Sequence, residues 1–257
     1  MIPKVIHYCW YGRNPLPELA LICIESWKKN SPDYEIIRWD ETNSNLYEND
    51  YIREAYESKK WAFVTDYIRL KVLFEYGGIY MDTDVEVLRS LNPFLSEAAF
   101  SGFENTTQIQ TGIIAAEKGH PFLYELMSYY KSRHFIKPDR TFDQKTNVIT
   151  ITEIFLEHGL IANNQKQTVC GFTLYPNDVF CPKNCDTGEI TITKDTVCIH
   201  HFAGSWYTYE EKKLKEISQK LKRKFGRIGG IIFKFYKYGV HPTNIIFRLK
   251  YGKKFWD

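Results

Sequence analysis

The sequence predicts an α/β protein with a Rossmann-like, mostly parallel sheet that is flanked by helices. Two observations support this fold class. Short apolar runs typical of buried strands alternate with segments in which apolar residues recur every three or four positions, as in amphipathic helices. Residues 1–88 also repeat the order strand, helix, strand, helix, strand, which is expected of a parallel nucleotide-binding sheet. The 257 residues, 44% of them hydrophobic, are sufficient for one main domain.

The elements of the first half can be placed in order. The N-terminal run I-P-K-V-I-H-Y-C-W predicts a buried strand that leads into a loop rich in glycine and proline. A helix over residues 17–29 and a strand over 34–39 follow, and residues 43–57 are irregular and then helical. A further helix covers residues 60–76 and ends at two glycines, and from residue 79 the apolar period of two predicts a third strand.

The second half is predicted with shorter elements. Two strands, over residues 98–103 and 111–116, flank a polar loop, and two helices cover 121–133 and 146–158. Extended segments around residues 175–176 and 180–182 precede a strand over 196–200, which leads into the heptapeptide H-H-F-A-G-S-W. A basic amphipathic helix begins at residue 210.

Four charged residues suggest a site near the third strand. Residues two apart on a strand share a face, so we expect Asp82 and Asp84 to present two carboxylates together, which suits Mg²⁺ or Mn²⁺. Asp66 and Arg69 are three apart on the preceding helix, and they form either an ion pair or a joint binding surface for a polar ligand. Taken alone, an Asp-x-Asp pair is common and is more often not a metal site.

The composite of these segments is more specific than its parts. W-A-F-V-T-D-Y-I-R-L followed by L-F-E-Y-G-G-I-Y-M-D-T-D-V-E-V-L resembles the sugar-binding region containing the DXD motif in glycosyltransferase family 32, which includes capsular polysaccharide transferases. It is similar, more distantly, to the glucosyltransferase cores of clostridial toxins. The resemblance implies a GT-A fold, a nucleotide sugar as donor, usually a UDP-sugar, and a metal that bridges the aspartates and the diphosphate. The N-terminal I-P-K-V-I-H-Y-C-W and the late H-H-F-A-G-S-W also resemble segments of this family.

The resemblance also implies roles for individual residues. Asp82 and Asp84 would hold the metal with His201, while Asp66 and Arg69 would act at the donor sugar or its diphosphate. Trp10 would stack on the nucleotide base, although core packing is the alternative for an aromatic residue in a first strand. The other residues expected to contact the donor are Tyr8, Tyr80, Thr83, Ser205 and Trp206.

These residues predict transfer of a sugar, with retention, from a UDP-sugar to a saccharide or lipid-linked saccharide acceptor. A metal-dependent nucleotide-sugar hydrolase or phosphoryl-transfer enzyme would use the same carboxylates, and a noncatalytic sugar-binding scaffold is a third possibility. We expect residues 1–209 to form the catalytic domain, with its donor half over about 1–120 and its acceptor half over 121–209. Residues 210–257 would form a basic extension.

Charge and composition bear on partners and location. Residues 210–257 contain 14 basic and 4 acidic residues, a net charge of +10, whereas the other 209 residues carry −7. This extension would lie on an anionic membrane surface, bind a partner or pack on the core, and nucleic acid is a poor fit. No apolar run is long enough to span a bilayer, so we expect a cytoplasmic protein or one peripheral at the inner face of the membrane. The six cysteines are expected to be free thiols, because C-P-K-N-C lacks further well-spaced zinc ligands.

Overall fold

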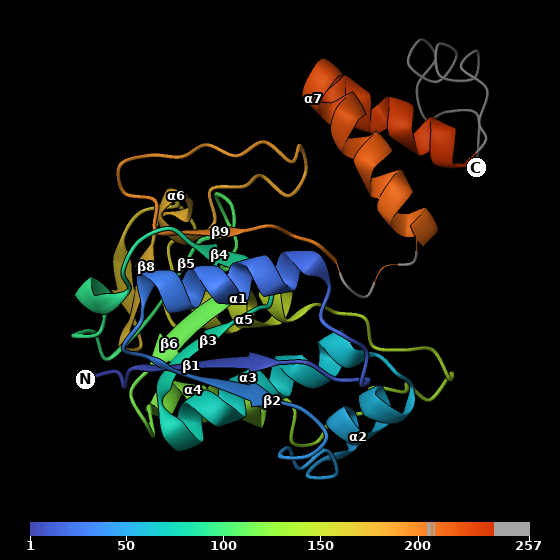
Figure 1. The fold of residues 1–257 in the computed structure, drawn as a ribbon. Helices are drawn as coiled ribbons and strands as arrows, with labels where there is room; N and C mark the ends of the chain where they lie inside the picture. Colours follow the sequence, from blue (N-terminus) through green and yellow to red (C-terminus); the bar gives the residue numbers. More distant parts are fainter. Residues whose placement is uncertain (205–206, 208, 239–257) are drawn as a thin grey trace. The chain divides into compact units, whose positions relative to one another are not determined.

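A seven-stranded sheet forms the centre of the larger part of the chain, as the computed structural model shows (Figure 1). Five of the seven strands run in one direction: β2, β1 and β3 are parallel, β6 is antiparallel to both β3 and β5, β8 is parallel to β5, and β7 is antiparallel to β8. In spatial order the strands are β2 (Glu35–Trp39), β1 (Val5–Cys9), β3 (Gly78–Met81), β6 (Ile113–Ala116), β5 (Ala99–Gly102), β8 (Phe172–Tyr175) and β7 (Gln167–Val169).

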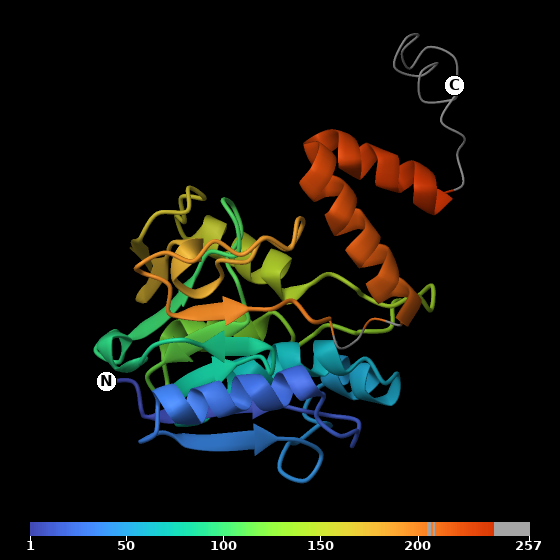
Figure 2. The same cartoon turned by 45° about the horizontal axis from the view of Figure 1, so that its top comes forward.

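Helices cover both faces of this sheet, which makes three layers (Figures 1 and 2). One face packs against α2 (Asp50–Glu57), α3 (Trp61–Tyr76), α4 (Pro121–Ser128) and α5 (Asn147–Glu157). The other packs against α1 (Glu18–Asn30), the short helix α6 (Asn177–Phe180) and a separate two-stranded sheet of β4 (Val85–Val87) and β9 (Cys198–His200). A 3₁₀ helix, η1 (Asn92–Phe94), follows β4.

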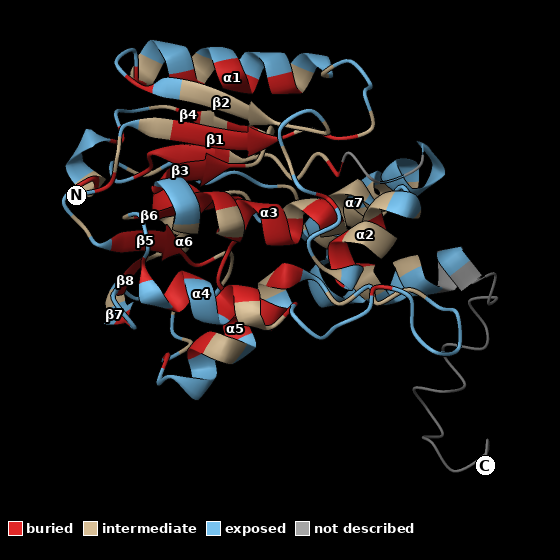
Figure 3. Ribbon diagram, turned by 90° about the horizontal axis from the view of Figure 1, so that it is seen from below, coloured by how far each residue is buried: buried red, intermediate tan, exposed pale blue. Residues whose placement is uncertain are grey.

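The five inner strands β1, β3, β6, β5 and β8 are almost entirely buried, because they carry mostly apolar residues, whereas the edge strand β2 is only partly buried (Figure 3). Along β3, Tyr80 belongs to the core cluster under α3, whereas Ile79 and Met81 belong to the cluster under α1. The indole of Trp27 on α1 donates to the Val85 carbonyl at 2.6 Å and so joins the helix to β4. The predicted α/β class, with a mostly parallel sheet flanked by helices, is confirmed.

Three local predictions were wrong. The aspartates at 82 and 84 do not lie on a strand, because β3 ends at Met81 and a turn closed by the Val85 amide on the Asp82 carbonyl precedes β4. The segment around residue 180 is the end of a short helix, which the preceding Pro176 at its N-cap position favours over an extended chain. Helix α4 ends at Ser128, five residues earlier than predicted.

The structure describes residues 1–204, 207 and 209–238, and these fall in two compact units. The first comprises Met1–Lys183 and Thr191–Trp206 and contains both sheets. The second comprises Asn184–Ile190 and the chain from Tyr207, and its described part is that loop with α7 (Tyr209–Tyr238). Among the described residues, no helix combines the length and the apolarity that crossing a membrane requires.

Candidate active site

The turn between β3 and β4 presents the two aspartates at the edge of the main sheet. Its backbone is fixed from two sides, because the Asp82 amide donates to the Gly112 carbonyl at 2.8 Å and the His201 amide donates to the Asp84 carbonyl at 2.9 Å. The amide of Ala203 also donates to the Asp84 carboxylate at 2.7 Å. Residues just before β6 and just after β9 therefore position the Asp-x-Asp turn.

His200, the last residue of β9, completes a three-residue cluster with these carboxylates. Its Nε2 lies 3.4 Å from Asp84 Oδ1 and 3.9 Å from Asp82 Oδ2. One ligand atom from each of the three residues lies within 4.8 Å of the others, and the three side chains are half-buried. The ring rests on the backbone of Gly112, where an added Cβ would be 2.8 Å from Nδ1, so this position requires glycine.

The structure does not bring His201, the histidine predicted as a metal ligand, into contact with the aspartates. His201 Nε2 instead contacts Glu86 Oε2 at 2.8 Å. The antiparallel register of β4 and β9 explains the exchange: Val85 pairs with His200 and Glu86 with Ile199, so His201 shares the face of Glu86. Alternation along the strand puts His200 on the opposite face, and its ring contacts the carboxylates of the turn that precedes β4.

Arg69 connects helix α3 to the aspartate turn. Its Nη2 lies 3.3 Å from Asp66 Oδ1 and 3.4 Å from Asp82 Oδ1, and its Nη1 donates to the Thr111 carbonyl at 2.7 Å. The guanidinium also stacks over the ring of Tyr80, 4.7 Å from its centroid, and the Tyr80 hydroxyl donates to Asp82 Oδ1 at 2.8 Å. Arg69 is therefore held rigidly with one side toward the candidate metal ligands.

Burial and charge shift the pKa values of this network in different directions. Burial raises the pKa of Asp66 to about 7 despite the neighbouring Arg69. It also raises the pKa of Asp82, against the opposing effect of Arg69 and His200. Asp84 has a pKa below its usual range because His200 and the Ala203 amide outweigh its burial, and the pKa of His200 is raised well above its ordinary value by Asp84. A positive charge is thus favoured between the carboxylates, where a cation would bind.

A buried amide pair beside Arg69 was not assigned a role from the sequence. Thr111, whose carbonyl accepts from Arg69, donates through its hydroxyl to Asn147 Oδ1 at 3.0 Å. The Nδ2 of Asn147 and both side-chain polar atoms of Gln110 are buried without a hydrogen-bond partner, although buried polar groups are nearly always paired. Asn147, at the start of α5, thus meets the segment that precedes β6.

The other residues predicted to contact a donor lie in several places. Trp10 follows β1, is partly exposed and donates from its indole to the Asn14 carbonyl at 2.7 Å. Tyr8 is buried against Trp27, with ring centroids 5.8 Å apart, so packing accounts for its position. Thr83 lies between the two aspartates. Ser205 and Trp206 lie outside the described residues.

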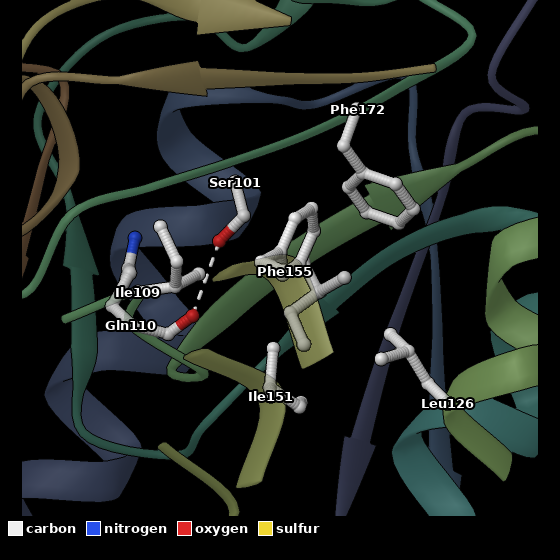
Figure 4. Close-up of a pocket in the computed structure, with 8 residues that line it drawn as sticks. Ser101, Ile109, Gln110, Leu126, Ile151, Phe155 and Phe172 are labelled. Atoms are coloured by element: carbon white, nitrogen blue, oxygen red, sulfur yellow. Dashed lines mark hydrogen bonds between the residues drawn. The ribbon is translucent and has the colours of Figure 1, made fainter. Parts of the chain in front are cut away.

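A small apolar pocket lies elsewhere in the core, between the sheet and helices α4 and α5 (Figure 4). The Ser101 hydroxyl donates to the Gln110 backbone carbonyl at 3.2 Å beside it. Its lining contains none of the predicted metal or donor ligands. The residues that line it are Ser101, Ile109, Gln110, Ile114, Leu126, Ile151, Phe155 and Phe172.

Several known proteins are similar to this chain. Inositol phosphoceramide mannosyltransferase 3 of Schizosaccharomyces pombe is 34% identical over 130 residues, which are 49% of this chain and 36% of that protein. Mannosyl phosphorylinositol ceramide synthase CSH1 of Saccharomyces cerevisiae is 28% identical over 165 residues, 62% of this chain and 43% of that protein. The chain therefore spans less than half the length of these curated relatives.

Among solved structures, a glycosyltransferase involved in the glycosylation of the major capsid of PBCV-1 is similar with a TM-score of 0.44 and 14% identity, over 83% of this chain and all of that one. Residues 17–101, which contain α1, α3 and the aspartate turn, match the family described as the glycosyltransferase sugar-binding region containing the DXD motif. The resemblance of this segment to the DXD-containing sugar-binding region, seen in the sequence, is confirmed by this match.

Proposed function

We propose that the chain is a metal-dependent glycosyltransferase that moves a sugar from a UDP-sugar to a hydroxyl of a saccharide or lipid-linked saccharide acceptor. The observation that carries this proposal is the meeting of Asp82, Asp84 and His200 within 4.8 Å at the carboxyl end of β3. Ligands bind at that edge in open α/β sheets. Arg69, buried and directed at Asp82, adds a fixed positive charge beside it.

The donor set fits Mn²⁺ or Mg²⁺. Two carboxylates and one imidazole supply hard oxygen ligands and a borderline nitrogen, and the ligand atoms are close enough to share one ion. When bound, such an ion would stabilise the negative charge on the diphosphate as the bond to the sugar breaks. Asp82, Asp84 and His200 would hold it, and His201 is replaced by His200 in this assignment.

The chain's own residues would position the donor. Arg69 can neutralise a phosphate oxygen without reorganising, because Thr65, Thr111 and Tyr80 already fix its guanidinium. Asp66 would accept hydrogen bonds from sugar hydroxyls. The unpartnered amide nitrogen of Asn147, next to Thr111, is a group that a polyhydroxylated ligand could satisfy.

We infer retention of anomeric configuration from the family resemblance. In this scheme the bond between the anomeric carbon and the phosphate oxygen breaks while the acceptor oxygen attacks from the same face. The acceptor hydroxyl gives its proton to the leaving phosphate oxygen. No carboxylate among the residues described at the site is needed as a covalent nucleophile.

The identity of the transferred sugar and of the acceptor is proposed from the names of relatives. Two relatives are named as mannosyltransferases or mannosyl synthases of inositol phosphoceramide. A human relative, 34% identical over 77 residues, 30% of this chain and 22% of that protein, is named as an α-1,4-N-acetylglucosaminyltransferase. We therefore propose a hexose or N-acetylhexosamine donor and a glycan or glycolipid acceptor, of which capsular polysaccharide is one case.

The test is donor hydrolysis in the absence of acceptor. The protein is incubated with Mn²⁺ and a panel of UDP-sugars, with GDP-mannose added because of the named relatives, and the products are separated. Release of nucleoside diphosphate and free sugar, lost with chelator and in an Asp84→Ala variant, supports the proposal. Release of nucleoside monophosphate would instead identify a pyrophosphatase, and turnover retained by Asp84→Ala would overturn the assigned site.

A further inference from the structure

Helix α7 consists of two arms that meet at Gly226. This residue has φ 55° and ψ −134°, outside the helical region, and its positive φ favours glycine. Gly229, one turn into the second arm, lies against the first arm so closely that an added Cβ would be 2.0 Å from the Leu221 carbonyl oxygen. The two arms therefore form a tight hairpin whose geometry depends on these two glycines.

Contacts within the second unit fix the first arm to the loop 184–190. Gln219 donates to the Cys185 carbonyl at 3.0 Å, Arg223 donates to the Thr187 carbonyl at 2.9 Å, and Lys222 pairs with Asp186. The polar side of this arm is thus partly used in holding the unit together.

Four large apolar side chains are exposed at and after the vertex. Ile228, Ile231 and Ile232 stand at i, i+3 and i+4 and so share one side of the second arm. Ile228, the first of them, is 64% exposed. The exposed side chains are Phe225, Ile228, Ile231 and Ile232, which we call the vertex patch.

Basic residues surround the vertex patch. Lys224 and Arg227 flank the vertex, and Lys234 lies one turn beyond Ile231 on the second arm. Over the whole of α7 there are ten basic and three acidic residues, a net charge of +7. A helix that combines an apolar stripe with a strongly basic remainder is typical of segments that lie in the interface of an anionic bilayer.

We propose that the vertex patch inserts into the headgroup region of an anionic lipid surface, with the lysines and arginines of α7 contacting the phosphates. The charge selects this occupant, because a neutral protein partner would not require a net charge of +7 beside an apolar patch. The surface is independent of the donor chemistry proposed for the aspartate site.

The full chain is tested by flotation with vesicles of phosphatidylcholine alone or with about 30% phosphatidylserine, at salt from about 0.1 M to about 0.5 M. We expect binding about tenfold tighter to the anionic vesicles and a steep loss with salt. The double variant Ile228→Glu/Ile232→Glu should bind at least about tenfold more weakly, because two insertion residues become charged.

The matched control is Leu21→Glu/Ile22→Glu on α1, which adds the same two charges at positions that are 55% and 52% exposed. This control should bind within about twofold of the parent chain. Circular dichroism and donor hydrolysis without vesicles verify that each variant is folded. Equal binding of the two double variants, or equal binding of the parent to neutral and anionic vesicles, would overturn the proposal.

A second copy of the chain is the other candidate occupant of the vertex patch. Sedimentation velocity without lipid tests this alternative. The vertex patch would be a protein interface if the parent dimerises with rising concentration, if Ile228→Glu/Ile232→Glu abolishes the dimer, and if the parent does not bind vesicles. We expect a species whose mass does not change with concentration.

Discussion

At the scale of single residues, adjacent histidines have different environments. His200 meets two carboxylates and the backbone of Gly112, whereas His201 meets Glu86. In the heptapeptide H-H-F-A-G-S-W the family resemblance favoured His201 as the ligand, although both residues carry the same imidazole group. The register of two short strands decides which one can serve the aspartate site.

Substituting each histidine by alanine provides a paired test. His200→Ala should weaken Mn²⁺ binding about tenfold or more, because one of the three ligands is lost, and His201→Ala should leave it within about threefold. Isothermal titration with Mn²⁺ and the nucleotide measures both affinities. The reverse order of effects would restore His201 as the ligand and show that the segment rearranges when metal binds.

His7 allows a prediction about pH and stability. The imidazole is fully buried, with Nε2 donating to the Gly77 carbonyl at 2.8 Å and Nδ1 accepting from the Trp39 indole at 3.1 Å. Protonation of Nδ1 would place its new N–H group against the N–H group of the Trp39 indole. Burial lowers the pKa of His7. Because the unfolded chain then takes up a proton more readily, the contribution of His7 to the free energy of unfolding should fall as pH drops below about 6.5, by at most about 1.4 kcal/mol per pH unit. The raised pKa of Asp66 acts in the opposite direction over the same pH range.

Urea unfolding of the parent and of His7→Gln between pH 5 and pH 7 measures this slope. Relative to the parent, the variant should lose less stability as the pH falls. Burial also lowers the pKa of His120, so part of the slope should persist in His7→Gln. A decline of the same size in the parent and in His7→Gln would contradict the assignment.

At the scale of secondary-structure elements, most boundaries follow from local chemistry. Helix α3 ends at Gly77, whose φ of 70° suits glycine, and α2 begins after Asn49, whose side chain accepts from the Ile52 amide at 3.0 Å. The aspartate turn could not be predicted from the apolar period of two, because this period continues through both β3 and β4. These strands belong to different sheets, and the turn lies between them.

Replacing the N-cap of α2 should cost a measurable part of the stability. Asn49→Ala removes the hydrogen bond to the Ile52 amide, and we expect the free energy of unfolding to fall by about 1 kcal/mol. Asn49→Asp retains an acceptor and should lose little. Thermal or urea unfolding of the two variants tests this, and equal stability of Asn49→Ala and the parent would show that water satisfies the helix end equally well.

At the scale of the whole molecule, ligand binding should couple to stability. If the aspartate site binds Mn²⁺ and UDP together, each at about 100 times its dissociation constant, the folded state gains about 2.7 kcal/mol relative to the unfolded chain for each linked site. We expect a rise in Tm with UDP and Mn²⁺ together that exceeds the rise with either alone. Asp84→Asn should abolish that excess while retaining the parent Tm without ligand to within a few degrees.

Local sequence determined the α/β class, the order of helices and strands through β3, and the Asp-x-Asp pair, because apolar periodicity and glycine at helix ends act over a few residues. The tertiary structure decided what depends on contacts between distant segments: the antiparallel β6 beside β3, the choice of His200, and the approach of Thr111 and Asn147 to Arg69. The pairing of β4 with β9, for example, joins residues over 100 positions apart, and no local pattern carries the information on such a neighbour or its register.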